Sequence, residues 1–78
     1  MIEPVAPIRH SLSVTPSDSS DLSMPCRALL VGVAGEVKVT YTSGVVDTLY
    51  LEAGMWHGMY VRRVWSTGTS ATGIHAGY

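Results

Sequence analysis

The sequence predicts an all-β protein, a small antiparallel β-sandwich or barrel of five or six strands with an extended N-terminal arm. Three observations support this class. Residues 28–51 contain three short apolar segments separated by glycine-bearing corners. Residues 36–41 alternate between apolar and polar side chains, which is the pattern of a strand with one buried face. No stretch of useful length has the 3.6-residue periodicity of an amphipathic helix.

Proline and glycine divide the chain into two parts. All four prolines lie in the first 25 residues, and all eight glycines lie from Gly32 onward. Proline favours extended backbone, whereas glycine allows tight turns. We therefore expect a Pro/Ser-rich arm over 1–25, with a short edge strand at 11–15, and a compact β domain over 26–78. The arm is aliphatic enough either to clamp a neighbouring subunit or to pack on its own domain.

The elements of the β domain follow from local patterns. The continuous apolar segment 26–33 indicates a strand buried on both faces, and 36–41 is the alternating strand. Residues 42–44 form a glycine-containing hairpin turn. The next strand, 45–51, has two alternating sets of residues that could face the core. The remaining elements are a turn at 52–54, one long or two short strands at 55–65, a loop at 66–70 and a last strand at 71–78.

The size of the chain indicates that it depends on other protein. A 78-residue domain buries only about 60% of its unfolded surface. Cys26 is the only cysteine, so no disulfide forms within the chain, and the three histidines lack the spacing of a metal site. Oligomerisation, or docking on a larger surface, is the remaining support.

Composition also excludes several functional classes. Charged residues are 14% of the chain and the net charge is −1, without the basic stripe of a nucleic-acid binder. No apolar segment approaches the ~20 residues of a membrane-spanning helix. The N-terminus has neither the basic nor the apolar region of a signal peptide. We expect synthesis in a cytoplasm, with the protein remaining there or leaving as part of a particle.

No pattern in the sequence indicates catalysis or a cofactor. His57 could be drawn into a triad with a serine and an aspartate, but no nucleophile elbow, phosphate-binding loop or metal-ligand pair is present. Cys26 is interpreted as a small buried residue at the start of a strand. We therefore expect a protein that is not an enzyme.

Candidate contact residues lie in the arm and in the last third of the chain. Tryptophan, tyrosine and arginine are favoured at protein interfaces. Of the four aromatic residues in the last third, which include Tyr78, we expect two in the core and two at a subunit contact. Consecutive arginines on a strand would point to opposite faces. Either one could reach a carboxylate on a partner, or cover apolar surface of its own domain with its stem while its head stays in water. The candidates are Ile2, Val5, Ile8, Trp56, Tyr60, Arg62, Arg63 and Trp65.

Two segments resemble a pattern of small tailed-phage head proteins. These are the glycine-cornered stretch from Arg27 to Thr40 and the later stretch from Val61 to Ile74. The segment Pro16-Ser17-Asp18 is similar to the Pro-Ser-Asp opening of the same proteins. Over residues 15–78 the chain resembles the head spike base family of phages and gene-transfer agents, and it is similar in style to capsid cement proteins. The segments 56–59 and 2–14 depart from the pattern.

The resemblance implies a non-enzymatic structural protein on the outer surface of a virion. It would act as a capsid decoration or cement protein, or as the base of a vertex spike. The implied partners are the major capsid protein, further copies in a trimer or pentamer, and a head fibre or spike protein; no nucleic acid, membrane or cofactor is implied. The alternative is a small soluble module that binds glycans or peptides, with Trp56, Tyr60 and Trp65 as a stacking face.

Overall fold

The computed structural model describes residues 8–78, which form six β-strands and no helix. All strand pairs are antiparallel, as the sequence predicted, and they belong to one sheet. Ile2 and Val5 lie outside the described residues. The strands are β1 (Ser11–Ser13), β2 (Cys26–Leu30), β3 (Gly35–Tyr41), β4 (Val46–Leu51), β5 (His57–Val64) and β6 (His75–Gly77).

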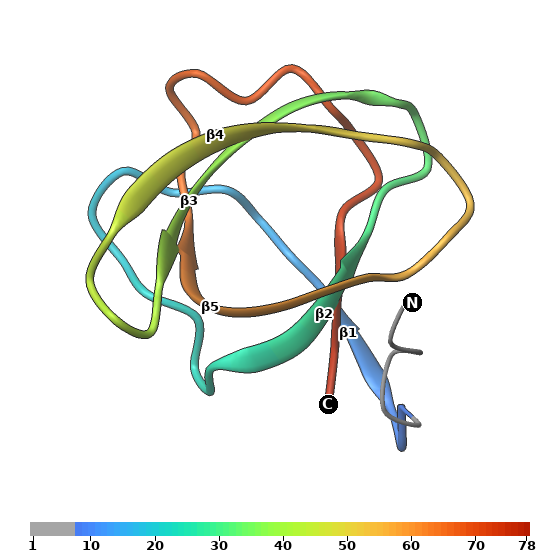
Figure 1. Ribbon diagram of the computed structural model, residues 1–78, viewed down its shortest axis with the longest axis horizontal. Coiled ribbons are helices and arrows are strands. Elements are labelled where there is room, and N and C mark those ends of the chain that lie inside the picture. Colours follow the sequence, from blue (N-terminus) through green and yellow to red (C-terminus); the bar gives the residue numbers. More distant parts are fainter. Residues whose placement is uncertain (1–7) are drawn as a thin grey trace, which may run out of the picture.

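The sheet has the strand order β1-β6-β2-β5-β3-β4 and curls round toward itself (Figure 1). The chain segments that follow β2 and β4 meet and partly close the sheet. There Val31 forms a parallel bridge with Ala53, and the Gly54 N–H donates to the Val31 carbonyl at 3.0 Å. A single curled sheet of this kind encloses the core in place of a second layer. β1 lies at one end of the molecule and β4 near the other (Figure 1).

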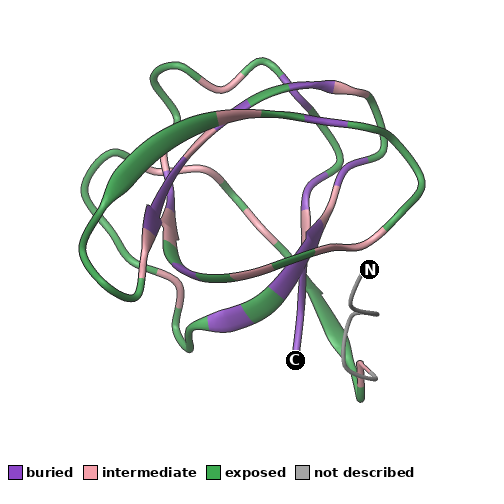
Figure 2. Ribbon diagram, viewed as in Figure 1, coloured by how far each residue is buried: buried purple, intermediate pink, exposed green. Residues whose placement is uncertain are grey.

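The core consists mainly of aliphatic residues of β2, β3 and β5, and it also includes Ala71, Ile74, Ala76 and Tyr78 near the C-terminus. Figure 2 shows where the buried residues lie along the chain. Val37 and Val39 are fully buried and alternate with more exposed neighbours, which confirms the alternating strand. The largest fully buried side chains are Leu29, Val31, Val37, Val39, Val61 and Cys26. Burial raises the pKa of the Cys26 thiol, so this cysteine is the small buried residue that the sequence indicated.

The β3–β4 hairpin has a regular register that decides which residues of β4 face inward. Val37 lies opposite Leu49, and Gly35 opposite Leu51. Directly opposed residues share a face of the sheet, so Leu49 and Leu51 are on the core side. The turn between the strands requires Gly44, whose φ of 94° is in the left-handed region that glycine adopts without strain.

A bulge in β5 corrects the expectation that the two arginines point to opposite faces. Val61 and Val64 are both buried, although regular alternation would place them on opposite sides. The register opposite β3 shifts at this point and leaves Arg62 as an extra residue between Val61 and Arg63. Neither arginine is buried as a result.

Residues 9–24 run along strands of the same chain. The Ser17 N–H donates to the Val64 carbonyl at 2.9 Å, and the Leu22 N–H donates to the Arg62 carbonyl at 2.7 Å. These bonds place the Pro-Ser-Asp segment beside the bulged end of β5. The division of the chain at residue 25 remains a prediction from composition.

Asp18 fastens this segment to the loop after β5. Its carboxylate accepts from the backbone N–H groups of Ser66 and Thr67, at 2.9 and 2.8 Å, and from the Thr67 hydroxyl. The hydroxyl bond is the largest of the effects that lower the pKa of Asp18. The aspartate therefore acts as a structural anchor of the loop.

Candidate functional site

The described residues contain no cluster of side chains that could hold a metal ion. No group of three or more histidine, cysteine or acidic side chains lies together within residues 8–78. Every buried polar side-chain atom in this part of the chain has a hydrogen-bond partner. The same residues include no helix with the length and hydropathy that a membrane crossing requires.

Ile8 and Trp56 form a small apolar contact on the outer face of the sheet. Both side chains lie over Gly77, where an added Cβ would be 2.8 Å from Ile8 Cδ1 and 2.9 Å from Trp56 Cζ3. Gly77 lies opposite Ala28, which is fully buried but does not belong to the main core cluster. The two candidates thus cover a flat site of small residues, and each stays half-exposed.

Trp65 is held by its own chain. Its indole N–H donates to the Thr40 hydroxyl at 2.8 Å. The Lys38 ammonium lies 4.7 Å from the ring centroid, and the Arg63 guanidinium carbon lies 5.1 Å from it. Cation–π contacts of this kind occupy the ring face that a ligand would stack on. This tryptophan therefore offers little free surface for a partner.

The two arginines have different surroundings. Arg63 is tied to its own chain, because its Nε donates to Asp21 Oδ1 at 2.7 Å. Arg62 is exposed, and among the described residues it has no carboxylate within salt-bridge distance. Of the pair, Arg62 is the residue that remains available for a carboxylate on another protein.

The four aromatic candidates are distributed over different sites. Tyr78 is 8% exposed and belongs to the core, whereas Tyr60 is 70% exposed. Trp56 and Trp65 are half-buried. The two tryptophans flank β5 and are separated by about 30 Å of extended chain. The structure does not bring them together with Tyr60 into one stacking face.

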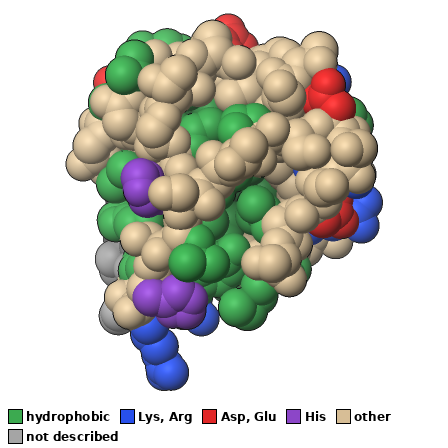
Figure 3. Space-filling view, turned by 180° about the vertical axis from the view of Figure 1, so that it is seen from behind, with side chains coloured by type: hydrophobic (Ala, Val, Ile, Leu, Met, Phe, Trp, Pro, Cys, Tyr) green, Lys and Arg blue, Asp and Glu red, His purple; other side chains and the backbone are tan. Residues whose placement is uncertain are grey.

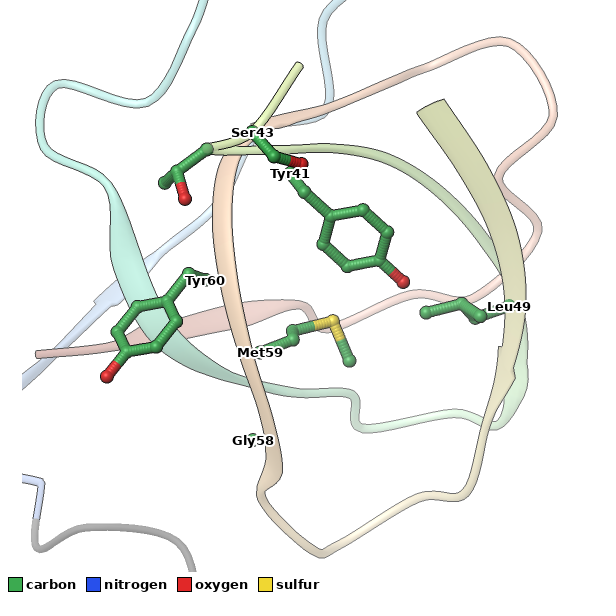
Figure 4. A pocket seen from close by; sticks show the side chains of 7 residues that line it. Tyr41, Ser43, Leu49, Gly58, Met59 and Tyr60 are labelled. Atoms are coloured by element: carbon green, nitrogen blue, oxygen red, sulfur yellow. The ribbon is translucent and has the colours of Figure 1, made fainter. Parts of the chain in front are cut away.

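A hollow that no pattern in the sequence indicates opens between β4 and the first half of β5 (Figure 4). Its volume is about 540 Å³, and its floor is apolar where Leu49 and Met59 point toward each other. Tyr41 closes one side; its hydroxyl donates to Asp47 Oδ2 at 3.3 Å, and burial together with this carboxylate raises the pKa of the phenol. Figure 3 shows hydrophobic side chains around a hollowed centre on the face opposite to that of Figure 1.

Strand β4 borders this hollow and is the most exposed long strand (Figure 2). Within residues 8–78 it pairs only with β3. Val46 and Tyr50 are 49% and 63% exposed, and Val45 just before the strand is 58% exposed. Apolar side chains gathered at an unpaired sheet edge are typical of a surface that another chain covers.

Comparison with known proteins relates this chain to a capsid. No protein-family model and no curated protein matches the chain. Among solved structures, it matches a chain of the structure described as "Capsid of native GTA particle computed with C5 symmetry", where GTA denotes a gene-transfer agent. The identity is 33% and the TM-score is 0.84, and the match covers 94% of this chain and 86% of the other. The chain therefore belongs to a family of capsid-related proteins of phages and gene-transfer agents.

Proposed function

We propose that this chain is a non-enzymatic structural protein on the outer surface of a tailed-phage head. It would act there as a decoration or cement protein, or as the base of a vertex spike. The observation that carries the proposal is its similarity, at 33% identity over 94% of its length, to a chain of a gene-transfer-agent capsid. The earlier resemblance of residues 15–78 to head spike base proteins agrees with it.

The extent of the match over both chains supports an accessory role in the capsid. The match takes in 86% of the other chain, so the two proteins are similar in length. A domain of this size with no disulfide or metal in the described residues gains stability from docking on a larger surface.

The proposed partners are the major capsid protein, further copies of this chain in a trimer or pentamer, and a head fibre or spike protein. Tyr60 and Arg62 are the exposed candidates on β5 for contact with the first or last of these. The half-exposed pair of Ile8 and Trp56 adds an apolar site on the outer face. The protein would be made in the host cytoplasm and remain on the finished virion.

The test compares particles made with and without this chain. Cryo-electron microscopy of the two preparations should show density of this fold on the outer surface of the first and its loss from the second. Purified protein added to the deficient particles should restore that density. Particles in which all external density is already explained without this chain would contradict the proposal.

The alternative function, a glycan- or peptide-binding module, has less support. Its stacking face required Trp56, Tyr60 and Trp65 together, but Trp56 packs over Gly77 and Trp65 is held by Thr40 and its neighbouring cations. Tyr60 alone is widely exposed.

A further inference from the structure

The sheet has two edges, and each of them has one neighbour among residues 8–78. β1 pairs only with β6, and β4 pairs only with β3. Proteins protect such edges with lysine, proline or a bulge. The six residues of β4 include neither lysine nor proline, and their register opposite β3 is regular. β1 consists of Ser11, Leu12 and Ser13, which carry no charge.

The backbone groups that β4 offers can be identified. The Tyr41 N–H donates to the Val45 carbonyl across the hairpin. Because bonded pairs alternate in an antiparallel ladder, Asp47 and Leu49 then face β3, and Thr48 faces the free edge together with Val46 and Tyr50. In agreement, the Thr48 N–H donates to the side chain of Asp47 at 2.9 Å instead of to β3.

The same reasoning identifies the groups that β1 offers. The Tyr78 N–H donates to the His10 carbonyl, and the Val14 N–H donates to the Ile74 carbonyl. Because hydrogen-bonded and non-bonded pairs alternate along the ladder, the N–H and C=O of Leu12 point toward β6. The N–H and C=O groups of Ser11 and Ser13 then point toward the free edge.

We propose that β1 of one copy pairs antiparallel with β4 of a second copy, with Ser13 opposite Thr48 and Ser11 opposite Tyr50. The edge-facing residues of both strands are exposed, so this pairing joins the outer faces of the two sheets and likewise their inner faces. The inference rests on the self-association contained in the proposed function and names the surfaces that produce it.

This register gives Leu12 a place to be buried. Leu12 lies in a row with Ala76 and Leu29, two core residues, yet it is 47% exposed. In the proposed pairing it lies opposite Leu49 of the second copy, at the apolar floor of the hollow beside Met59. A half-exposed leucine on the core side of one edge thus meets an open apolar hollow at the other edge.

The pairing ends at Tyr50, because beyond it the edge is occupied by the same chain: Val31 bridges to Ala53, and the Gly54 N–H donates to the Val31 carbonyl. The partner strand is equally short, since the chain bends at Arg9 just before β1. Every copy carries both edges, so the contact is head-to-tail and forms a ring where the rotation closes.

An intermolecular disulfide tests the register directly. Ser13→Cys and Thr48→Cys are made on separate chains, mixed and oxidised. Opposed residues of a bonded pair lie about 5.5 Å apart at Cα, within disulfide range. Cys26 is 1% exposed and does not compete. A cross-linked heterodimer is expected from this mixture and not from Ser13→Cys with Tyr60→Cys; equal yields from both mixtures would overturn the proposal.

Substitution at one position tests the energetic contribution of the edge. Thr48→Pro removes the edge N–H without removing a bond to β3, whereas Thr48→Val keeps that N–H. Sedimentation should show self-association weakened about tenfold or more by proline and little changed by valine. If proline lowers the thermal midpoint as well, Leu12 gives the answer: it is 47% exposed in the single chain, so Leu12→Asp should weaken association without lowering the thermal midpoint. Association that is unchanged by Leu12→Asp would contradict the pairing.

The outcomes separate this inference from the proposed function. If the wild-type protein binds deficient particles but the Ser13→Cys and Thr48→Cys variants give no specific cross-link, the proposed function is retained and the edge pairing is lost. Protein that cross-links as expected but does not bind particles retains the pairing and loses the role on the capsid.

Discussion

Strands β2 and β4 are both short and mainly apolar, yet they serve different purposes. β2 has neighbours on both sides, and Ala28 and Leu29 in its middle are fully buried. β4 has one neighbour and buries only Leu51. Apolar residues in β2 therefore hold the fold, whereas Val46 and Tyr50 of β4 lie exposed at an edge. The difference shows that apolar content identifies a strand without saying whether its partner is the same chain or another.

The largest expected effect is loss of a core side chain from β2. Leu29→Ala leaves a cavity among fully buried residues and should lower the free energy of unfolding by about 2–5 kcal/mol. Denaturant unfolding followed by circular dichroism measures it. Leu12→Ala is the matched leucine at the edge and should cost much less in the isolated chain; an equal loss would remove the distinction between core and edge.

A smaller loss is expected where the sheet approaches a loop. An added Cβ at Gly35 would lie 2.8 Å from the backbone nitrogen of Ala71. Gly35→Ala forces the backbone apart and should destabilise by roughly 1–3 kcal/mol. Gly44→Ala is the control for backbone strain, since its φ is positive but nothing lies within 4 Å of the added Cβ. Thermal unfolding of both variants separates crowding from strain.

The loop anchor should give a pH-dependent effect. Hydrogen bonds from Thr67 and Ser66 lower the pKa of Asp18 in the folded state. The stabilisation is thus complete above the ordinary aspartate value and is lost as pH falls through the lower folded value. Asp18→Asn should reduce the melting temperature at pH 7, with a difference from wild type that narrows in acid. A difference that is constant down to pH 2 would show that the carboxylate charge does not matter.

The smallest effect on the isolated chain is expected at the edge. Val46→Ala removes an exposed side chain of β4 and should change the free energy of unfolding by no more than about 0.5 kcal/mol. The same variant should weaken self-association measured by sedimentation. A marked loss of folding stability would indicate that β4 is already covered in the isolated chain.

Much of the fold could be predicted because its signals are local. The valines of β3 alternate, and Gly44 marks the hairpin turn to β4. The pairing of β2 with β5 and of β1 with β6 joins residues far apart in sequence, and no local pattern specifies it. The bulge at Arg62 was also missed, because a single extra residue is visible only when the opposite strand is in place.

The candidate site was predictable in composition but not in geometry. Trp65 and Arg63 have the residue types of an interface, yet they contact Thr40 and Asp21 of their own chain. The hollow near Leu49 arises where β4 and β5 separate on either side of β3, which depends on the curvature of the whole sheet.

Hydrogen exchange in the free protein and in intact particles tests the division of roles most directly. The amides of Val46, Thr48 and Tyr50 face the free edge, whereas that of Leu49 faces β3. The account predicts slow exchange at Leu49 in both states, and at the three edge amides rapid exchange in the dissociated chain that becomes slow in the particle. Edge amides that exchange equally fast in both states would contradict the role of β4 as an assembly edge.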